Sequence, residues 1–121
     1  MRTCLIVDDS RVVRKVACRI LEALDFETLE AGDGLEALSV CRASMPDAVL
    51  LDWRMPVMDG LEFLQKLRAE PGGDGPVVLF CTAETDPERI SSAVHGGADE
   101  YIMKPFDGDI IVAKFAEAGL L

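Results

Sequence analysis

The sequence has no apolar run long enough to cross a membrane. Runs such as 48–51 and 77–81 fall far short of the roughly 20 residues that a membrane-spanning helix needs. The first residues, Met1 to Cys4, lead directly into another short apolar run without the pattern of a signal peptide. We therefore expect no membrane anchor and no signal peptide, and we expect the protein to reside in the cytoplasm.

The sequence also lacks a surplus of positive charge. Its 12 Lys and Arg residues stand against 22 Asp and Glu residues, so the formal net charge is −10. Because nucleic-acid phosphates repel a protein of this charge, direct binding of DNA or RNA is not expected. The acidic balance suits a site for a cation instead.

No C-x-x-C pair is present among the four cysteines, and each cysteine stands in an apolar stretch. This spacing favours buried free thiols in a reducing cytosol over disulfides or zinc ligands. The residues concerned are Cys4, Cys18, Cys41 and Cys81.

Neither an internal repeat nor a low-complexity tract divides the chain of 121 residues, half of which are hydrophobic. A chain of this length buries enough surface to form a core without disulfides. The Gly- and Pro-rich segment 71–76 is interpreted as a surface loop, because a boundary there would leave too few elements on either side. We expect one domain over 1–121, with no output domain attached.

Short β-rich runs alternate with helical patterns along the chain. Strands are predicted at Thr3 to Val7, Phe26 to Glu30, Ala48 to Leu51, Val77 to Cys81 and Glu100 to Met103. Helices are predicted at 12–24 with Ser10 as the cap, Leu35 to Ala43, Leu61 to Leu67 with Asp59 as the cap, Asp86 to His95, and Ile110 to Ala118 after Asp107. This alternation predicts an α/β fold in which a doubly wound, five-stranded parallel sheet is covered by five helices.

Acidic side chains follow two of the apolar strands. Asp8 and Asp9 end the first strand, and Asp52 ends the third. If the strand order is 2-1-3-4-5, these two strands are neighbours and the three carboxylates meet where ligands bind in such sheets. Thr82 and Lys104, at the ends of the fourth and fifth strands, then lie along the rim of the same pocket.

Three carboxylates in one pocket require a counter-charge. Two of them 4 Å apart repel by about 4 kcal/mol at an effective dielectric constant near 20. Lys104 supplies one positive charge, and the all-oxygen ligand set favours Mg²⁺ for the remainder. The alternative is that each Asp caps a helix or a turn, which is the commoner role of a single Asp, but the convergence of three strand-end carboxylates argues against it.

The residues around this pocket resemble the signature of two-component response-regulator receiver domains, most closely the stand-alone chemotaxis type. The resemblance extends over the whole chain. Its motifs are Asp8-Asp9-Ser10, the segment from Asp52 to Gly60 that reads DWRMPVMDG, Thr82-Ala83-Glu84, and the segment from Tyr101 to Phe106 that reads YIMKPF. It implies the flavodoxin-like order 2-1-3-4-5.

The resemblance implies that Asp52 accepts a phosphoryl group from a phosphohistidine of a histidine kinase or a histidine phosphotransfer protein. It assigns Mg²⁺ to the carboxylates of Asp8, Asp9 and Asp52 and to the backbone carbonyl of Arg54. It places Lys104, the Thr82 hydroxyl and the backbone amide of Ala83 on phosphoryl oxygens. These contacts suit a carboxylate that forms an acyl phosphate.

The resemblance also implies a signalling switch built from Thr82 and Tyr101. Movement of Thr82 toward the phosphoryl group leaves space that Tyr101 fills, and the surface that binds an unknown downstream protein then changes. The alternative for Tyr101 is an aromatic side chain at the rim with its hydroxyl in water.

Two positions depart from the chemotaxis pattern. Arg54 stands where Asn is frequent, and Glu84 lies two residues after Thr82. We hypothesise that these opposite charges pair across the mouth of the pocket and change the rate of dephosphorylation. The alternative is that both side chains point into solvent, where such a pair contributes less than about 1 kcal/mol.

The first predicted helix carries a basic stripe in an otherwise acidic protein. In relatives this helix docks the phosphohistidine-bearing partner, and positive charge there would raise the association rate. The alternative is an ordinary solvated helix face. The residues concerned are Arg11, Arg14, Lys15 and Arg19, of which the first three are the predicted docking residues.

Other functions remain as alternatives to a phosphoaccepting switch that turns over no metabolite. One is a receiver-like interaction module that acts without phosphorylation. A flavin carrier is disfavoured because Asp8 and Asp9 would repel the FMN phosphate. A haloacid-type phosphatase is disfavoured because Arg54 stands where its second Asp is needed.

Overall fold

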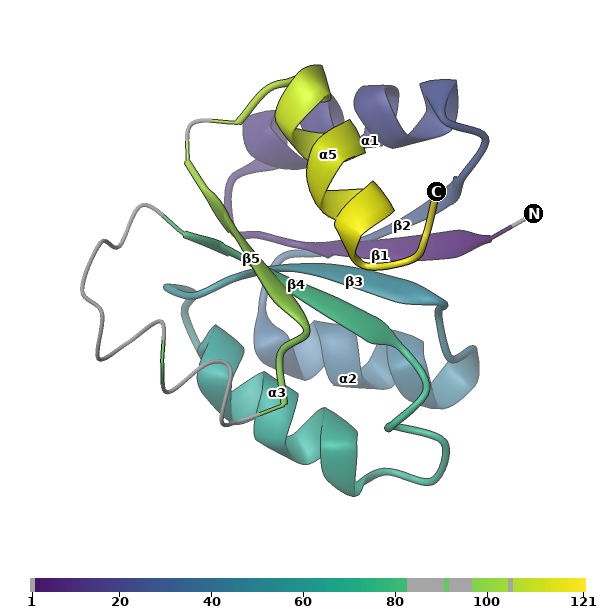
Figure 1. Ribbon diagram of the computed structural model, residues 1–121. Coiled ribbons are helices and arrows are strands. Elements are labelled where there is room, and N and C mark those ends of the chain that lie inside the picture. The colour runs from purple at the N-terminus through teal and green to yellow at the C-terminus, as the bar shows by residue number, and fades with distance from the viewer. Residues whose placement is uncertain (1, 83–90, 92–96, 105) are drawn as a thin grey trace.

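The computed structural model describes residues 2–82, 91, 97–104 and 106–121, and strands alternate with helices over residues 3–82 (Figure 1). The elements are β1 (Thr3–Val7), α1 (Arg11–Ala23), β2 (Glu27–Ala31), α2 (Gly34–Ala43), β3 (Ala48–Asp52), α3 (Gly60–Ala69), β4 (Val77–Thr82), β5 (Glu100–Met103) and α5 (Gly108–Glu117). Each corresponds to a predicted element: β1 and β5 coincide with their predicted ranges, and the ends of the others differ by at most two residues. The predicted helix from Asp86 to His95 lies, apart from Ser91, outside the described residues, so the structure describes four helices of the expected five.

The five strands form one parallel sheet in the order β2-β1-β3-β4-β5. The chain winds from β1 to β2 at one edge and then returns to β3 on the other side of β1. The winding direction therefore reverses between β1 and β3, and ligands of doubly wound sheets bind at the carboxyl ends of the strands at this reversal. The predicted α/β fold and strand order are confirmed.

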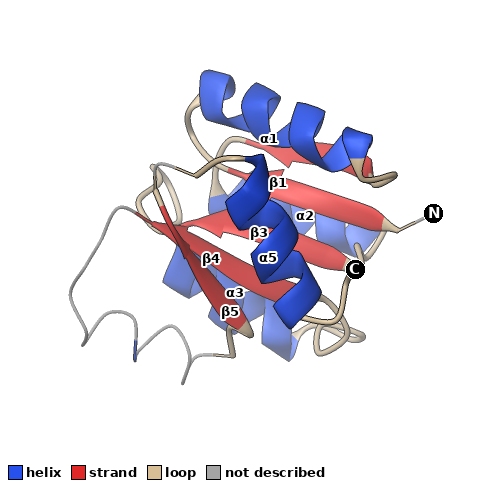
Figure 2. Cartoon of the chain, turned by 45° about the horizontal axis from the view of Figure 1, so that its top comes forward, coloured by secondary structure: helices blue, strands red, loops and turns tan. Residues whose placement is uncertain are grey.

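Helices cover both faces of the sheet, α1 and α5 on one face and α2 and α3 on the other (Figures 1 and 2). Each face has its own apolar cluster, because alternate residues of a strand point to opposite faces. All five residues of β3 are buried, as expected for a central strand. The edge strand β2 is partly exposed, also as expected.

Side-chain caps begin each described helix. Ser10 Oγ accepts from Val13 N at 3.3 Å, and Asp33, Asp59 and Asp107 accept through Oδ1 from the amide three residues later at 2.8 to 2.9 Å. Each such cap is worth about 1 kcal/mol. These helices have 10 to 13 residues, and in the described part of the chain none is long and apolar enough to span a membrane.

All four cysteines are free and buried, which confirms the prediction from their spacing. Burial raises the pKa of Cys4 and of Cys81 to about 12 and that of Cys41 to about 11, and it also raises the pKa of Cys18. These thiols therefore stay protonated near neutral pH and act as small core residues rather than as thiolates.

Candidate functional site

Three carboxylates meet at the reversal point of the sheet. Val7 of β1 pairs with Leu51 of β3, so Asp8 and Asp52 follow at adjacent strand ends. Asp8 and Asp52 are buried, whereas Asp9 is exposed. One oxygen of each of the three carboxylates lies within 4.8 Å of the others. The predicted convergence of these side chains is therefore present.

Lys104, which follows β5, lies between the two buried carboxylates. Its Nζ atom lies 2.8 Å from Asp8 Oδ2 and 3.1 Å from Asp52 Oδ1. The side chain of Asp52 is 11% exposed and that of Lys104 is 22% exposed, so the centre of the pocket still reaches solvent. Lys104 is the predicted counter-charge, and it contacts the carboxylates directly.

The charges in the pocket change the proton affinity of its members. Burial raises the pKa of Asp52, and the neighbouring Asp8 raises it further, although Lys104 and the Trp53 amide act in the opposite direction. Burial by itself would lower the pKa of Lys104, but hydrogen bonding to Asp8 and the two carboxylate charges outweigh burial and raise it. Lys104 therefore stays charged, while an ionised Asp52 costs folding free energy.

Two close backbone approaches hold the loop that follows Asp52. Gly60 N donates to Trp53 O at 2.8 Å, and a Cβ atom on Gly60 would collide with the carbonyl oxygen of Asp52. Gly34 N donates to Met58 O at 3.2 Å, and a Cβ there would lie only 2.7 Å from that oxygen. Only glycine permits both approaches, so the glycines fix the loop against β3 and α2.

The same loop contains a strained turn at Val57. Met58 N donates to Pro56 O at 2.7 Å, and Val57 between them has a φ of 69°. A β-branched residue in this left-handed γ-turn region costs about 1–2 kcal/mol. Val57 is 76% exposed, so packing does not compensate for the strain.

Glycine at position 57 is expected to raise the free energy of unfolding by about 1 kcal/mol, because it removes the Cβ that opposes a positive φ. Urea denaturation of Val57→Gly measures this change. The matched variant Val57→Ala keeps a Cβ, so its free energy of unfolding should rise by less. A gain from alanine equal to that from glycine would contradict the strain at this turn.

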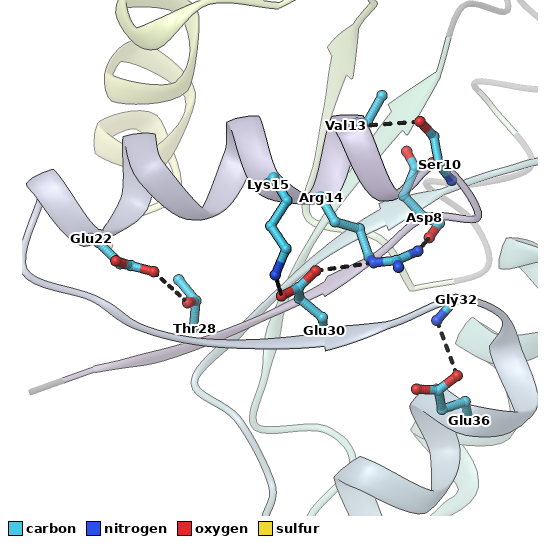
Figure 3. Close-up of polar contacts among 10 residues, drawn as sticks. All are labelled: Asp8, Ser10, Val13, Arg14, Lys15, Glu22, Thr28, Glu30, Gly32 and Glu36. Atoms are coloured by element: carbon cyan, nitrogen blue, oxygen red, sulfur yellow. Dashed lines mark hydrogen bonds and ion pairs between the residues drawn. The ribbon is translucent and has the colours of Figure 1, made fainter.

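Basic residues of α1 contact the edge strand β2 (Figure 3). Arg14 Nε lies 3.1 Å from Glu30 Oε1, and Arg14 Nη1 donates to the backbone carbonyl of Asp8 at 2.7 Å. Lys15 Nζ lies 2.7 Å from Glu30 Oε2. Hydrogen bonding to Lys15 lowers the pKa of Glu30, and Arg14 lowers it further against the opposing effect of burial. Glu30 is therefore ionised and bonded on both oxygens.

These contacts bear on the predicted docking surface. Arg11 is exposed and the Lys15 side chain is 52% exposed, but the Arg14 side chain is only 18% exposed. Because Arg14 is turned toward Glu30, it does not offer its charge freely to a partner. A docking role for the three residues stays a prediction.

Glu30 was not among the site residues predicted from the sequence. A signal was available: alternate residues of a strand share a face, so Glu30 lies on the face of the apolar Phe26 and opposite to Leu29. That face is covered by α1, where Arg14 and Lys15 provide positive charge. An acidic residue on a strand face that also carries a buried aromatic residue indicates such a partner.

Several predicted site residues lie at the margin of the described structure. Thr82 ends β4, where it pairs in register with Met103 of β5. Ala83 and Glu84 lie outside the described residues, so the predicted amide contact and the predicted pair of Glu84 with Arg54 stay predictions. The Arg54 side chain is exposed.

Tyr101 lies on β5 and is partly buried. Its ring packs against the apolar cluster on the α2 and α3 face, and Lys114 Nζ lies 5.1 Å from the ring centroid. Lys114 also pairs with Glu100 at 3.3 Å. Tyr101 is therefore neither a fully buried residue nor a rim aromatic without packing, and its role as a switch stays a prediction.

The donor set of the pocket fits a divalent cation. It consists of carboxylate oxygens, which Mg²⁺ prefers. With the three carboxylates ionised, their charge of −3 and the +1 of Lys104 leave −2, which one divalent ion would neutralise. The exposed Asp9 provides a side open to solvent from which an ion can enter.

Comparison with known sequences gives consistent matches. The sequence model of the response regulator receiver domain matches residues 4–116. The DNA-binding response regulator MtrA of Mycolicibacterium paratuberculosis is 39% identical over 110 residues, which are 91% of this chain and 48% of that protein. MtrA of Mycobacterium leprae is 39% identical over the same shares of the two chains. This chain thus spans about half the length of these relatives.

Solved structures give the same result for the fold. The chemotaxis response regulator CheY4 of Vibrio cholerae superposes with a TM-score of 0.92 at 30% identity, over 98% of both chains. A CheY-like receiver domain protein of Methanospirillum hungatei gives a TM-score of 0.87 at 29% identity, over 97% of this chain and 92% of the other. The family match over residues 4–116 includes the strand ends that carry the acidic pocket.

Proposed function

The chain belongs to the response regulator receiver domain family, and we propose that it accepts a phosphoryl group on Asp52 from a phosphohistidine of a histidine kinase or of a histidine phosphotransfer protein. The observation that carries this proposal is the position of Asp52. It ends a buried central strand, yet its side chain remains 11% exposed beside Lys104. A carboxylate so placed is fixed in direction and can still meet a partner's phosphohistidine.

The transfer exchanges one bond to phosphorus for another. A carboxylate oxygen of Asp52 bonds to phosphorus while the P–N bond of the phosphohistidine breaks, and the leaving imidazole takes up a proton from solvent. Asp52 is held for this step by the β3 ladder and by the 3.1 Å contact of its Oδ1 with Lys104. After transfer, Lys104 is within reach of a phosphoryl oxygen on Asp52.

The carboxylates of Asp8, Asp9 and Asp52 would hold Mg²⁺, with the backbone carbonyl of Arg54 as a further ligand. When bound, the ion neutralises negative charge on the transferring group. Before the ion binds, the attraction of Lys104 to both buried carboxylates offsets the repulsion between them. We therefore expect phosphoryl uptake to require a divalent cation.

Signal output would depend on Thr82 and Tyr101. The ring of Tyr101 is only partly buried, and Lys114 Nζ lies 5.1 Å from its centroid. A phosphoryl group that draws Thr82 toward Asp52 would bias Tyr101 inward and change the surface that a downstream protein binds.

A receiver-like interaction module that acts without phosphorylation is the alternative. It needs no acidic pocket, whereas here two buried carboxylates lie side by side at a cost in folding free energy. Proteins retain such costs mainly at functional sites. The pocket therefore favours the phosphoaccepting function.

Trp53 provides the test of the proposed function, because this single tryptophan directly follows Asp52 and its ring packs 4.8 Å from that of Phe80. Addition of Mg²⁺ should change its fluorescence, and beryllofluoride, a phosphoryl mimic, should change it again only when Mg²⁺ is present. The control variant Asp52→Asn should not respond to beryllofluoride. A wild-type chain that responds to neither addition would favour the interaction module.

A further inference from the structure

The proposed function leaves unused the polar network between α1 and β2 (Figure 3). Arg14 contacts two groups in it, donating from Nη1 to the Asp8 carbonyl and from Nε to Glu30. Lys15 donates to the other oxygen of Glu30 at 2.7 Å. The guanidinium is therefore held from two directions, and Glu30 in turn is held by two cations.

The contact with Arg14 completes the hydrogen bonding of Asp8. Asp8 N donates to Ala31 O at 3.1 Å, and Oδ1 accepts from Ser10 N at 2.8 Å. Oδ2 accepts from Lys104 and the backbone carbonyl accepts from Arg14. Each polar atom of Asp8 thus has a partner, and the partner of its carbonyl comes from the helix rather than from the sheet.

The carbonyl of Asp8 belongs to the peptide unit that joins Asp8 to Asp9. Because a peptide unit is planar, a fixed carbonyl also fixes the direction in which the chain enters Asp9. Asp9 is exposed, so packing contributes little to the direction of its carboxylate. Arg14 therefore acts on the spacing between the buried and the exposed carboxylates of the pocket.

We infer that Arg14 is a positioning residue for the acidic pocket, and that Glu30 holds Arg14 in place. The inference rests on the proposed function, since Mg²⁺ is the ligand whose affinity it concerns. The charge of Arg14 by itself would repel a cation from the pocket, and Glu30 cancels that charge. The two effects therefore predict opposite changes in Mg²⁺ affinity when Arg14 is replaced by a neutral residue: loss of positioning weakens binding, whereas loss of the positive charge strengthens it.

The affinity of the pocket for Mg²⁺, measured by Trp53 fluorescence, tests this inference. Loss of a residue that orients a metal ligand typically weakens metal binding by about tenfold or more. Arg14→Gln should therefore raise the Kd for Mg²⁺ by about tenfold, although it removes a cation. Arg14→Lys keeps the charge but lacks the planar fork that reaches both partners, and it should weaken binding similarly.

Arg42→Lys is the matched control, because Arg42 also donates from Nε to a glutamate, Glu70, at 2.8 Å. That pair joins α2 to the end of α3 and has no contact with the pocket, so the Kd for Mg²⁺ should not change. Glu30→Gln should weaken binding in the same direction as the Arg14 variants. If Arg14→Gln binds Mg²⁺ as tightly as the wild type or more tightly, charge prevails and the inference is overturned.

Amide hydrogen exchange at Ser10 provides a second readout that needs no metal. The Ser10 amide donates to Asp8 Oδ1 at 2.8 Å, so a less ordered Asp8 should speed its exchange in Arg14→Lys, while exchange at Leu5 in β1 stays slow. Unchanged exchange at Ser10 overturns the inference. If the wild type shows no response to Mg²⁺, the proposed function fails, and the exchange result still decides the role of Arg14.

Discussion

Alanine in place of Lys104 is expected to lower the free energy of unfolding by about 3 kcal/mol in a buffer without divalent cations. The substitution leaves Asp8 and Asp52 side by side without their shared cation, although both are buried. Added Mg²⁺ should restore more stability to the variant than to the wild type, because the ion would replace the missing charge. Chemical denaturation with EDTA or with Mg²⁺ measures both effects.

Lys114→Ala is the control for this prediction. Lys114 pairs with Glu100 and with Glu117, but these carboxylates are more exposed than Asp8 and Asp52. Its loss should therefore cost less than about 1 kcal/mol, and Mg²⁺ should not restore it. A Lys104→Ala variant that is as stable as the wild type in EDTA would mean that the two buried carboxylates do not need a counter-charge.

Asparagine in place of Asp52 is expected to make the protein more stable by about 1 kcal/mol and unable to accept a phosphoryl group. The buried carboxylate is destabilising when ionised, because burial and Asp8 raise its pKa. Asparagine removes the charge and keeps an oxygen that can accept from Lys104. Urea denaturation measures the stability, and the fluorescence response to beryllofluoride measures the loss of function.

The pH dependence of the stability difference between Asp52→Asn and the wild type tests whether the charge of Asp52 is its cause. A carboxyl whose pKa is raised by folding loses its unfavourable charge as the pH falls through that raised value. The free energy of unfolding of the wild type therefore rises relative to that of the variant. The stability difference should be largest near neutral pH and shrink toward acid. The exposed helix cap Asp59→Asn is the control and should change stability little. A less stable Asp52→Asn variant at neutral pH would contradict the account.

Local sequence signals accounted for most of the fold. The caps at Ser10, Asp59 and Asp107 and the buried run at Ala48 to Leu51 each fix an element without reference to distant residues. Some strand ends shifted by one residue, because hydrogen bonding to neighbouring strands decides where pairing stops. The left-handed turn at Val57 was not predicted, since valine normally avoids that conformation.

The site was predictable in part for a related physical reason. Asp8, Asp9 and Asp52 follow strands, and the topology of a parallel sheet brings strand ends together, so their meeting could be foreseen. The direct contacts of Lys104 with both buried carboxylates depend on side-chain geometry after β5. The contact of Arg14 with the Asp8 carbonyl depends on how α1 packs on β2. Such distances between side chains follow from packing, which the strand pattern does not specify.

Intact-mass spectrometry after incubation with acetyl phosphate tests directly whether Asp52 is the phosphoacceptor. We expect the wild-type chain to gain one phosphoryl group with Mg²⁺ and none with EDTA, and Asp52→Asn to gain none in either buffer. Phosphoryl uptake by the Asp52→Asn variant, or no uptake by the wild type with Mg²⁺, would contradict the assignment of Asp52 as the phosphoacceptor.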